Sequence, residues 1–100
     1  MEFVYEQALQ EYMVQKGKKN IVVEVAQSSH SDFDVQELHV HFVNEKQAEF
    51  LKSKKRFRAK STFMGEVLLP PYRLEYDDTV VFGLKAFLCF KLITHRGIRF

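Results

Sequence analysis

The sequence predicts a small α+β domain built mainly from an antiparallel or mixed β-sheet, with an N-terminal helix and a second helix after the second strand. Three observations lead to this class. Apolar residues recur at helical spacing near the start of the chain, and β-branched and aromatic residues alternate with polar ones in several later segments. The resulting order, α-β-β-α-β-β-β, does not alternate as β-α-β units. We expect residues 1–100 to form a single domain.

The N-terminal helix is predicted over residues 3–16. Its apolar side chains recur at i, i+3, i+4, i+7 and i+8 and form one stripe: Tyr5, Ala8, Leu9, Tyr12 and Met13. Gly17 follows as the expected C-terminal stop. We therefore expect this helix to cover one face of the sheet.

Two strands are predicted next, over residues 20–26 and 35–43, with a polar loop over residues 27–34 between them. Alternation in the second strand gives its core face three residues: Leu38, Val40 and Phe42. Because side chains alternate along a strand, His39 and His41 then lie together on the opposite face.

The second helix is predicted to begin at a capping box. Asn44 and Gln47 have the required spacing, and the helix should run to about Lys54. Ala48 and Leu51 are expected on its inner side.

Short strands or extended segments are predicted in the C-terminal half. Residues 56–60 should form an edge strand or a linker, and residues 66–69 and 72–76 should form two short strands. A turn is expected at Asp77-Asp78, after the last of these. Pro70-Pro71 should end the strand at residues 66–69, because proline lacks a backbone donor. A bend is expected at Arg96-Gly97.

The most apolar segment, residues 79–93, is predicted to be one long strand that bends or bulges at Gly83. Period-two spacing assigns its core face to five residues: Leu84, Ala86, Leu88, Phe90 and Leu92. The single cysteine, Cys89, is expected to be a small buried residue, because no activating group adjoins it.

Composition limits the classes of protein. The net charge is +2, hydrophobic residues make up 46% of the chain, and one cysteine cannot form an intramolecular disulfide. We find neither a signal-peptide pattern nor an apolar run of the roughly 18–20 residues that a spanning helix needs. We therefore expect a cytoplasmic protein that has no membrane partner.

Two segments of the sequence resemble a known family. Gln-Lys-Gly-Lys-Lys leads into Ile-Val-Val-Glu-Val and a polar loop, and the chain closes with Leu-Lys-Ala-Phe-Leu-Cys-Phe-Lys-Leu-Ile-Thr-His-Arg-Gly-Ile. This pattern resembles the small HesB-like proteins related to A-type iron–sulfur carriers, including the short family with a Cys-Cys or Cys-selenocysteine pair. The resemblance covers about half of the chain and implies a HesB-like fold.

The resemblance does not extend to the cluster ligands of that family. Ser28 and Ser29 fall where the vicinal pair of the short family lies, and no Cys-x-Cys pair is present near the C-terminus. A serine hydroxyl is a poor ligand for soft iron. The resemblance thus implies a HesB-like accessory domain in which a classical iron–sulfur cluster is not expected.

A weak divalent-metal site is one hypothesis from the residues themselves. His39 and His41 share a strand face, and His30 and Asp32 lie in the predicted loop before them. Imidazole and carboxylate groups are the ligands that zinc or iron takes. The alternative is an ordinary solvated strand face beside a polar loop.

Positive charge is concentrated in one segment. Six basic residues lie within residues 52–60, with no acid among them: Lys52, Lys54, Lys55, Arg56, Arg58 and Lys60. They could contact the phosphates of a polyanion, with Phe57 available for stacking. Alternatively, the lysines form the solvated end of a helix, where the helix dipole favours them.

No enzyme motif is present, so we predict a protein that is not an enzyme. The first hypothesis is a small HesB-like accessory or binding domain with a protein partner and at most a weak metal site. The alternative is a domain that binds nucleic acid or an acidic partner through residues 52–60. A third is a protein-binding domain that uses an exposed edge strand.

Overall fold

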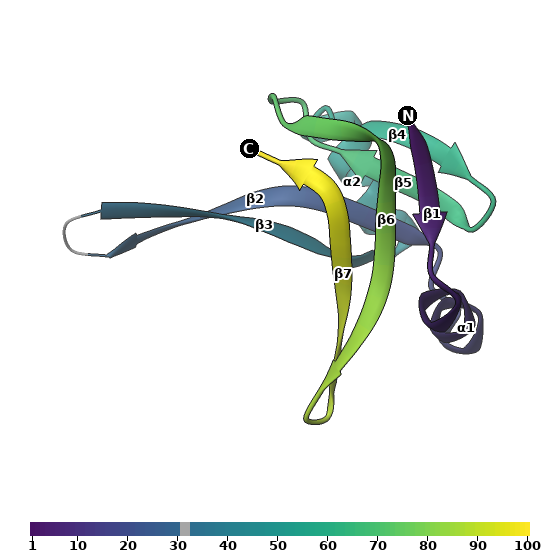
Figure 1. Ribbon diagram of the computed structural model, residues 1–100. Coiled ribbons are helices and arrows are strands. Elements are labelled where there is room, and N and C mark those ends of the chain that lie inside the picture. The colour runs from purple at the N-terminus through teal and green to yellow at the C-terminus, as the bar shows by residue number, and fades with distance from the viewer. Residues whose placement is uncertain (31–32) are drawn as a thin grey trace.

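The computed structural model describes residues 1–30 and 33–100, with the side chains of residues 27–30 and 33–35 outside the description (Figure 1). Its elements are β1 (Glu2–Tyr5), α1 (Gln7–Lys16), β2 (Asn20–His30), β3 (Phe33–Val43), α2 (Glu45–Lys54), β4 (Arg58–Thr62), β5 (Gly65–Leu69), β6 (Glu75–Phe87) and β7 (Phe90–Arg99).

The strands form two sheets, which confirms the α+β class with mixed pairing. A three-stranded sheet has the order β1-β6-β7, and a four-stranded sheet has the order β3-β2-β5-β4. The pairs β1–β6 and β2–β5 are parallel, while the other neighbours are antiparallel. The β2–β3 and β6–β7 hairpins extend beyond the body of the molecule as two separate arms (Figure 1).

The main core contains residues of both sheets and of α1. Phe82 is fully buried there and lies parallel to Phe3, with ring centroids 5.9 Å apart. Leu9 and Met13 supply the buried side of α1, as the sequence pattern predicted. A smaller apolar cluster lies under α2, where Ala48 is buried.

The N-terminal helix begins later than predicted. Residues 2–5 form β1, which runs parallel to β6 with Tyr5 opposite Phe82, and Glu6 is extended before α1 starts. Pairing with a strand far along the sequence outweighs the helical spacing of these residues. The predicted stop is confirmed: Gly17 adopts φ 66° in the left-handed region.

The predicted faces of the strand at residues 35–43, now part of β3, and the predicted helix α2 are confirmed. His39 and His41 are exposed on β3, while its three predicted core residues pack against the main core: Leu38, Val40 and Phe42. The capping box is complete. The Asn44 side chain accepts from the Gln47 backbone N–H at 2.7 Å, and the Gln47 side chain accepts from the Asn44 N–H at 3.0 Å.

The predicted polar loop over residues 27–34 is wrong. β2 continues to His30 and β3 begins at Phe33, with Ser29 opposite Asp34 in the ladder. Pairing of main-chain groups satisfies the backbone whatever the side chains are. Polar composition therefore did not mark the end of these strands.

The predicted long strand over residues 79–93 is also wrong. β6 ends at Phe87 and the chain reverses at Leu88-Cys89, so that Phe87 pairs with Phe90. The turn contains none of the Gly, Asn or Asp residues that usually mark a hairpin. As a result Phe90 is 62% exposed rather than buried, and Cys89 is exposed as well.

Smaller predictions near this hairpin also fail. β6 begins at Glu75, so the predicted strand at 72–76 is mostly absent, and Asp77-Asp78 lies within β6 rather than in a turn. The ladder is irregular between Tyr76 and Val81, whereas Gly83 lies in a regular part opposite Thr94.

The bend predicted at Arg96-Gly97 lies inside β7. Gly97 takes a positive φ of 91° there, and a Cβ at this position would lie 2.6 Å from the Thr79 carbonyl oxygen. The glycine permits close approach of two backbones instead of ending the strand.

Candidate anion-binding cleft

A cleft of about 500 Å³ lies where the chain leaves α2 and where it approaches β6. Its volume falls within the range of small-molecule sites. Its lining residues include three arginines and two tyrosines and no carboxylate: Arg56, Arg58, Pro71, Tyr72, Arg73, Leu74 and Tyr76.

Local backbone geometry brings these residues together. Arg56 follows the last residues of α2 with φ 60°, the left-handed conformation in which glycine is usual. Pro70 and Pro71 end β5 and turn the chain towards the opposite wall of the cleft. Leu74 is buried in the main core and anchors that wall.

The two tyrosines differ in their contacts. The Tyr72 hydroxyl accepts a hydrogen bond from the backbone N–H of Val25 at 2.8 Å, which fixes its position. The Tyr76 hydroxyl is buried and has no hydrogen-bond partner within the part of the chain that the structure describes. Burial raises the pKa of Tyr76, while the charge of Arg58 acts in the opposite direction.

The arginines of the cleft carry uncompensated charge. Among the described residues, no carboxylate oxygen lies within 4.0 Å of the guanidinium groups of Arg56, Arg58 or Arg73. One guanidinium group can donate two parallel N–H hydrogen bonds to two oxygens of the same phosphate. The cleft is thus suited to an anionic group.

The predicted basic segment divides into parts with different surroundings. Lys52 lies 3.1 Å from a Glu66 oxygen and 3.3 Å from a Glu49 oxygen, and the hydrogen bond to Glu66 raises the pKa of Lys52. Its charge is therefore compensated within the fold. Three further predicted residues are exposed near the cleft residues in sequence: Lys54, Lys55 and Lys60.

The histidines predicted to bind metal each contact a carboxylate. His39 Nε2 lies 3.2 Å from Glu37 Oε2, and His41 Nε2 lies 2.7 Å from Glu24 Oε1. Among the residues whose side chains the structure describes, no group of three potential ligands is placed to hold a metal ion.

Of the other predicted metal ligands, only the backbone position of His30 is described. His30 lies six residues beyond Glu24 on β2, which corresponds to about 20 Å of extended strand. Asp32 lies outside the described residues. Ser28 and Ser29 belong to the β2 ladder rather than to a loop, and their side chains are outside the description.

The sequence pattern does not mark the second half of the cleft as a site. It predicts Tyr72, Arg73 and Tyr76 only as residues of a short strand. The signal was present as arginine interleaved with tyrosine after Pro70-Pro71, which is typical of anion-binding and stacking surfaces.

Comparison with protein-family models, curated proteins and solved structures finds none that matches this chain. The HesB-like resemblance therefore stays a prediction from the sequence. Among the described residues, no helix has the length and apolar character needed to span a membrane.

Proposed function

We propose that this chain is a non-enzymatic binding domain whose cleft holds single-stranded nucleic acid. One observation carries the proposal: Arg56, Arg58 and Arg73 line one cleft, and none has a carboxylate partner among the described residues. These arginines lie beside two tyrosines, so phosphate-binding and stacking groups adjoin one another.

Each group has a separate task in the proposed complex. The arginines contact successive phosphates through paired N–H donors. The ring of Tyr72, held by its hydrogen bond to Val25, offers a face for a base. Tyr76 lines the cleft beside Tyr72, but its hydroxyl is buried, so it is assigned no contact with the ligand.

The proposed affinity is weak and depends on salt rather than on sequence. With three phosphate contacts, the logarithm of the association constant should fall with the logarithm of salt concentration with a slope of about −2. No group in the cleft is placed to read one particular base, because stacking accepts any base.

Fluorescence anisotropy with labelled oligo(dT) and oligo(U) at several salt concentrations tests the proposal. Arg58→Gln and Arg73→Gln should each weaken binding and reduce the salt slope by about 0.7. Lys85→Gln and Lys91→Gln are matched controls, because they remove the same charge near the turn of the β6–β7 hairpin, at residues that do not line the cleft. Equal effects of the four substitutions would contradict the proposed site.

Heparin separates nucleic acid from other anionic partners. It carries negative charge but no bases, so Tyr72→Ala should weaken binding of oligo(dT) and leave binding of heparin unchanged. A parallel loss for both ligands would instead indicate an acidic partner without stacked bases.

The HesB-like accessory role and the weak zinc site remain separate proposals from the sequence. The support for the zinc site is that His39 and His41 share one exposed strand face. A zinc titration that follows the ring resonances of both histidines tests it directly.

A further inference from the structure

The outer half of the β6–β7 hairpin, residues 83–94, is an arm with a strongly apolar tip. Four large side chains near its turn are exposed by more than half: Phe87 (59%), Leu88 (85%), Phe90 (62%) and Leu92 (54%). Together they present roughly 400–500 Å² of apolar surface, about the size of the largest patch on an ordinary monomer, and such patches are often functional.

The backbone conformation of the turn residue Leu88 is unfavourable in the unbound protein. Leu88 has φ 56°, a conformation that glycine adopts easily and that a branched side chain resists. Its side chain is largely exposed, so its packing does little to offset this strain. Strain of this kind at an exposed position points to a function of the side chain.

The β2–β3 arm provides an internal comparison. It is also a long two-stranded extension, yet residues 27–34 at its end are polar except for Phe33. An arm of this architecture thus does not require an apolar tip. Folding alone does not account for the phenylalanines and leucines of the β6–β7 arm.

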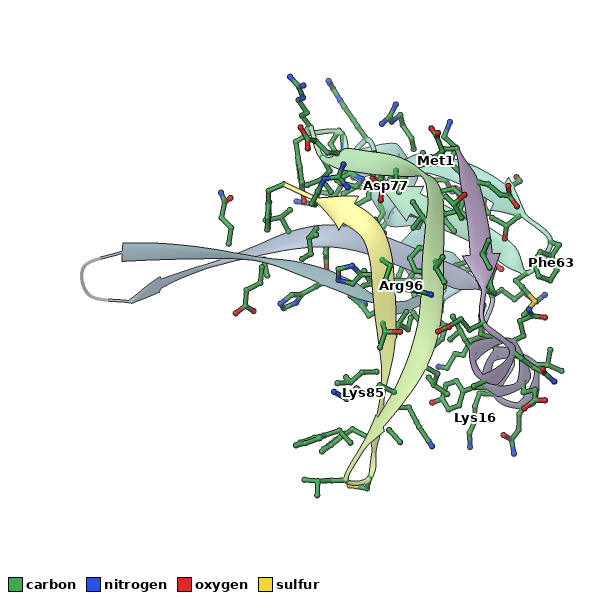
Figure 2. The ribbon with its side chains drawn as sticks, viewed as in Figure 1. Met1, Lys16, Phe63, Asp77, Lys85 and Arg96 are labelled. Atoms are coloured by element: carbon green, nitrogen blue, oxygen red, sulfur yellow. The ribbon has the colours of Figure 1, made fainter. Side chains whose placement is uncertain are left out.

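The charge beside the tip indicates the chemistry of the partner. Lys85 pairs with Leu92 and Lys91 pairs with Ala86, so the two lysines flank the apolar tip on opposite faces of the hairpin. Neither lysine has a carboxylate within 4.0 Å in the described part of the chain. Figure 2 shows Lys85 extending from the arm.

The same arm of a second copy does not complement this arm. Residues 79–100 contain no Asp or Glu, so a partner arm would bring lysines together without any acid to pair them. The apolar tip is also smaller than the about 800 Å² per partner that a stable interface usually buries.

A lipid bilayer is a poor match for a different reason. Pairing of β1 with β6 ends at Phe82, and the described strands place no further strand beside either outer edge of the arm. Backbone groups on these open edges would lose their hydrogen bonds in hydrocarbon, at a cost of several kcal/mol each. A partner strand can satisfy those groups instead.

We propose that the β6–β7 arm docks an extended segment of a partner protein that carries both apolar and acidic side chains. The segment adds as a strand to one outer edge of the arm, so its main chain pairs with the free backbone groups. Its apolar side chains cover the tip, and its carboxylates pair with Lys85 and Lys91. This inference is independent of the proposed nucleic-acid site.

Selection of phage-displayed random peptides against the immobilised full chain tests the proposal. Enriched peptides should alternate apolar residues with Asp or Glu. For a synthetic peptide of the enriched sequence, Phe90→Ser should weaken binding by about tenfold or more and Lys91→Gln by about threefold. Phe63→Ser is the matched control, because Phe63 is also highly exposed but lies away from the arm (Figure 2).

Leu88→Gly distinguishes docking from folding. Glycine relieves the backbone strain, so the melting temperature should stay equal or rise while affinity for the peptide falls. Failure to enrich peptides whose binding depends on Phe90 would overturn the proposal. So would tip-dependent binding to phosphatidylserine vesicles, or tip-dependent self-association in sedimentation velocity.

Discussion

The hydroxyl of Tyr72 accepts a hydrogen bond from the backbone N–H of Val25, 47 residues earlier in the chain, at 2.8 Å. The parallel pairing of β2 with β5 includes Ile21 and Val22, so Val25 lies past its end. Tyr72 thus satisfies a donor on that edge of β2. The same bond fixes the aromatic ring at the cleft.

Substitutions of Tyr72 should separate the effect of its aromatic ring on binding from the effect of its hydrogen bond to Val25. Tyr72→Phe keeps the stacking face but leaves the Val25 N–H without this acceptor, so oligo(dT) affinity should fall by a small factor. Tyr72→Ala removes the ring and should cost about 1–3 kcal/mol of binding free energy. Anisotropy titrations measure both, and equal losses would show that the ring does not stack.

Arg56→Gly should stabilise the fold and weaken binding. The residue occupies the left-handed region, which costs a non-glycine residue about 1 kcal/mol or more, so glycine should raise the free energy of unfolding by about 0.5–1 kcal/mol. Lys55→Gly is the control: Lys55 has φ −102°, and glycine there brings no relief. Urea denaturation measures both, and a stability loss in Arg56→Gly would contradict the argument.

Two phenylalanines of the same hairpin should respond in opposite ways to truncation. Phe82 is fully buried in the main core, so Phe82→Ala should lower the free energy of unfolding by about 3–5 kcal/mol through cavity formation. Phe90 is largely exposed, and Phe90→Ala should cost less than about 1 kcal/mol. A large loss in the second variant would restore the single-strand interpretation, in which Phe90 is a core residue.

The stability of the fold should decline at alkaline pH, in part through Tyr76. Burial raises its pKa above the value near 10 of an unfolded chain. Below about pH 10 the tyrosine is protonated in both states, so it adds no pH dependence to the free energy of unfolding. Between the unfolded and folded pKa values the unfolded state binds fewer protons, so the free energy of unfolding falls as pH rises. Tyr76→Phe should reduce that decline in urea titrations, and an unchanged profile would argue against burial.

Local rules predicted those parts of the fold that depend on neighbouring residues. The capping box of Asn44 and Gln47 involves only residues within one turn of the helix. The shared exposed face of His39 and His41 follows from the alternation of side chains along a strand. Both predictions hold because no distant segment competes with them.

The rest depends on contacts between distant segments or on unusual turns. β1 is a strand because residues 79–82 pair with it, and nothing within residues 2–5 shows this. The reversal at Leu88-Cys89 uses residues that rarely form tight turns. The cleft likewise joins Arg58 to Arg73, which belong to separate segments of the sequence.

The parallel pairing of β1 with β6 also fixes an order of assembly. Glu2 lies opposite Thr79, so the first strand cannot enter its sheet until the ribosome has released the residues that follow Asp78. The four-stranded sheet spans residues 20–69 and can close earlier, from contacts of shorter sequence separation. During synthesis, the N-terminal segment therefore waits unpaired while the middle of the chain folds.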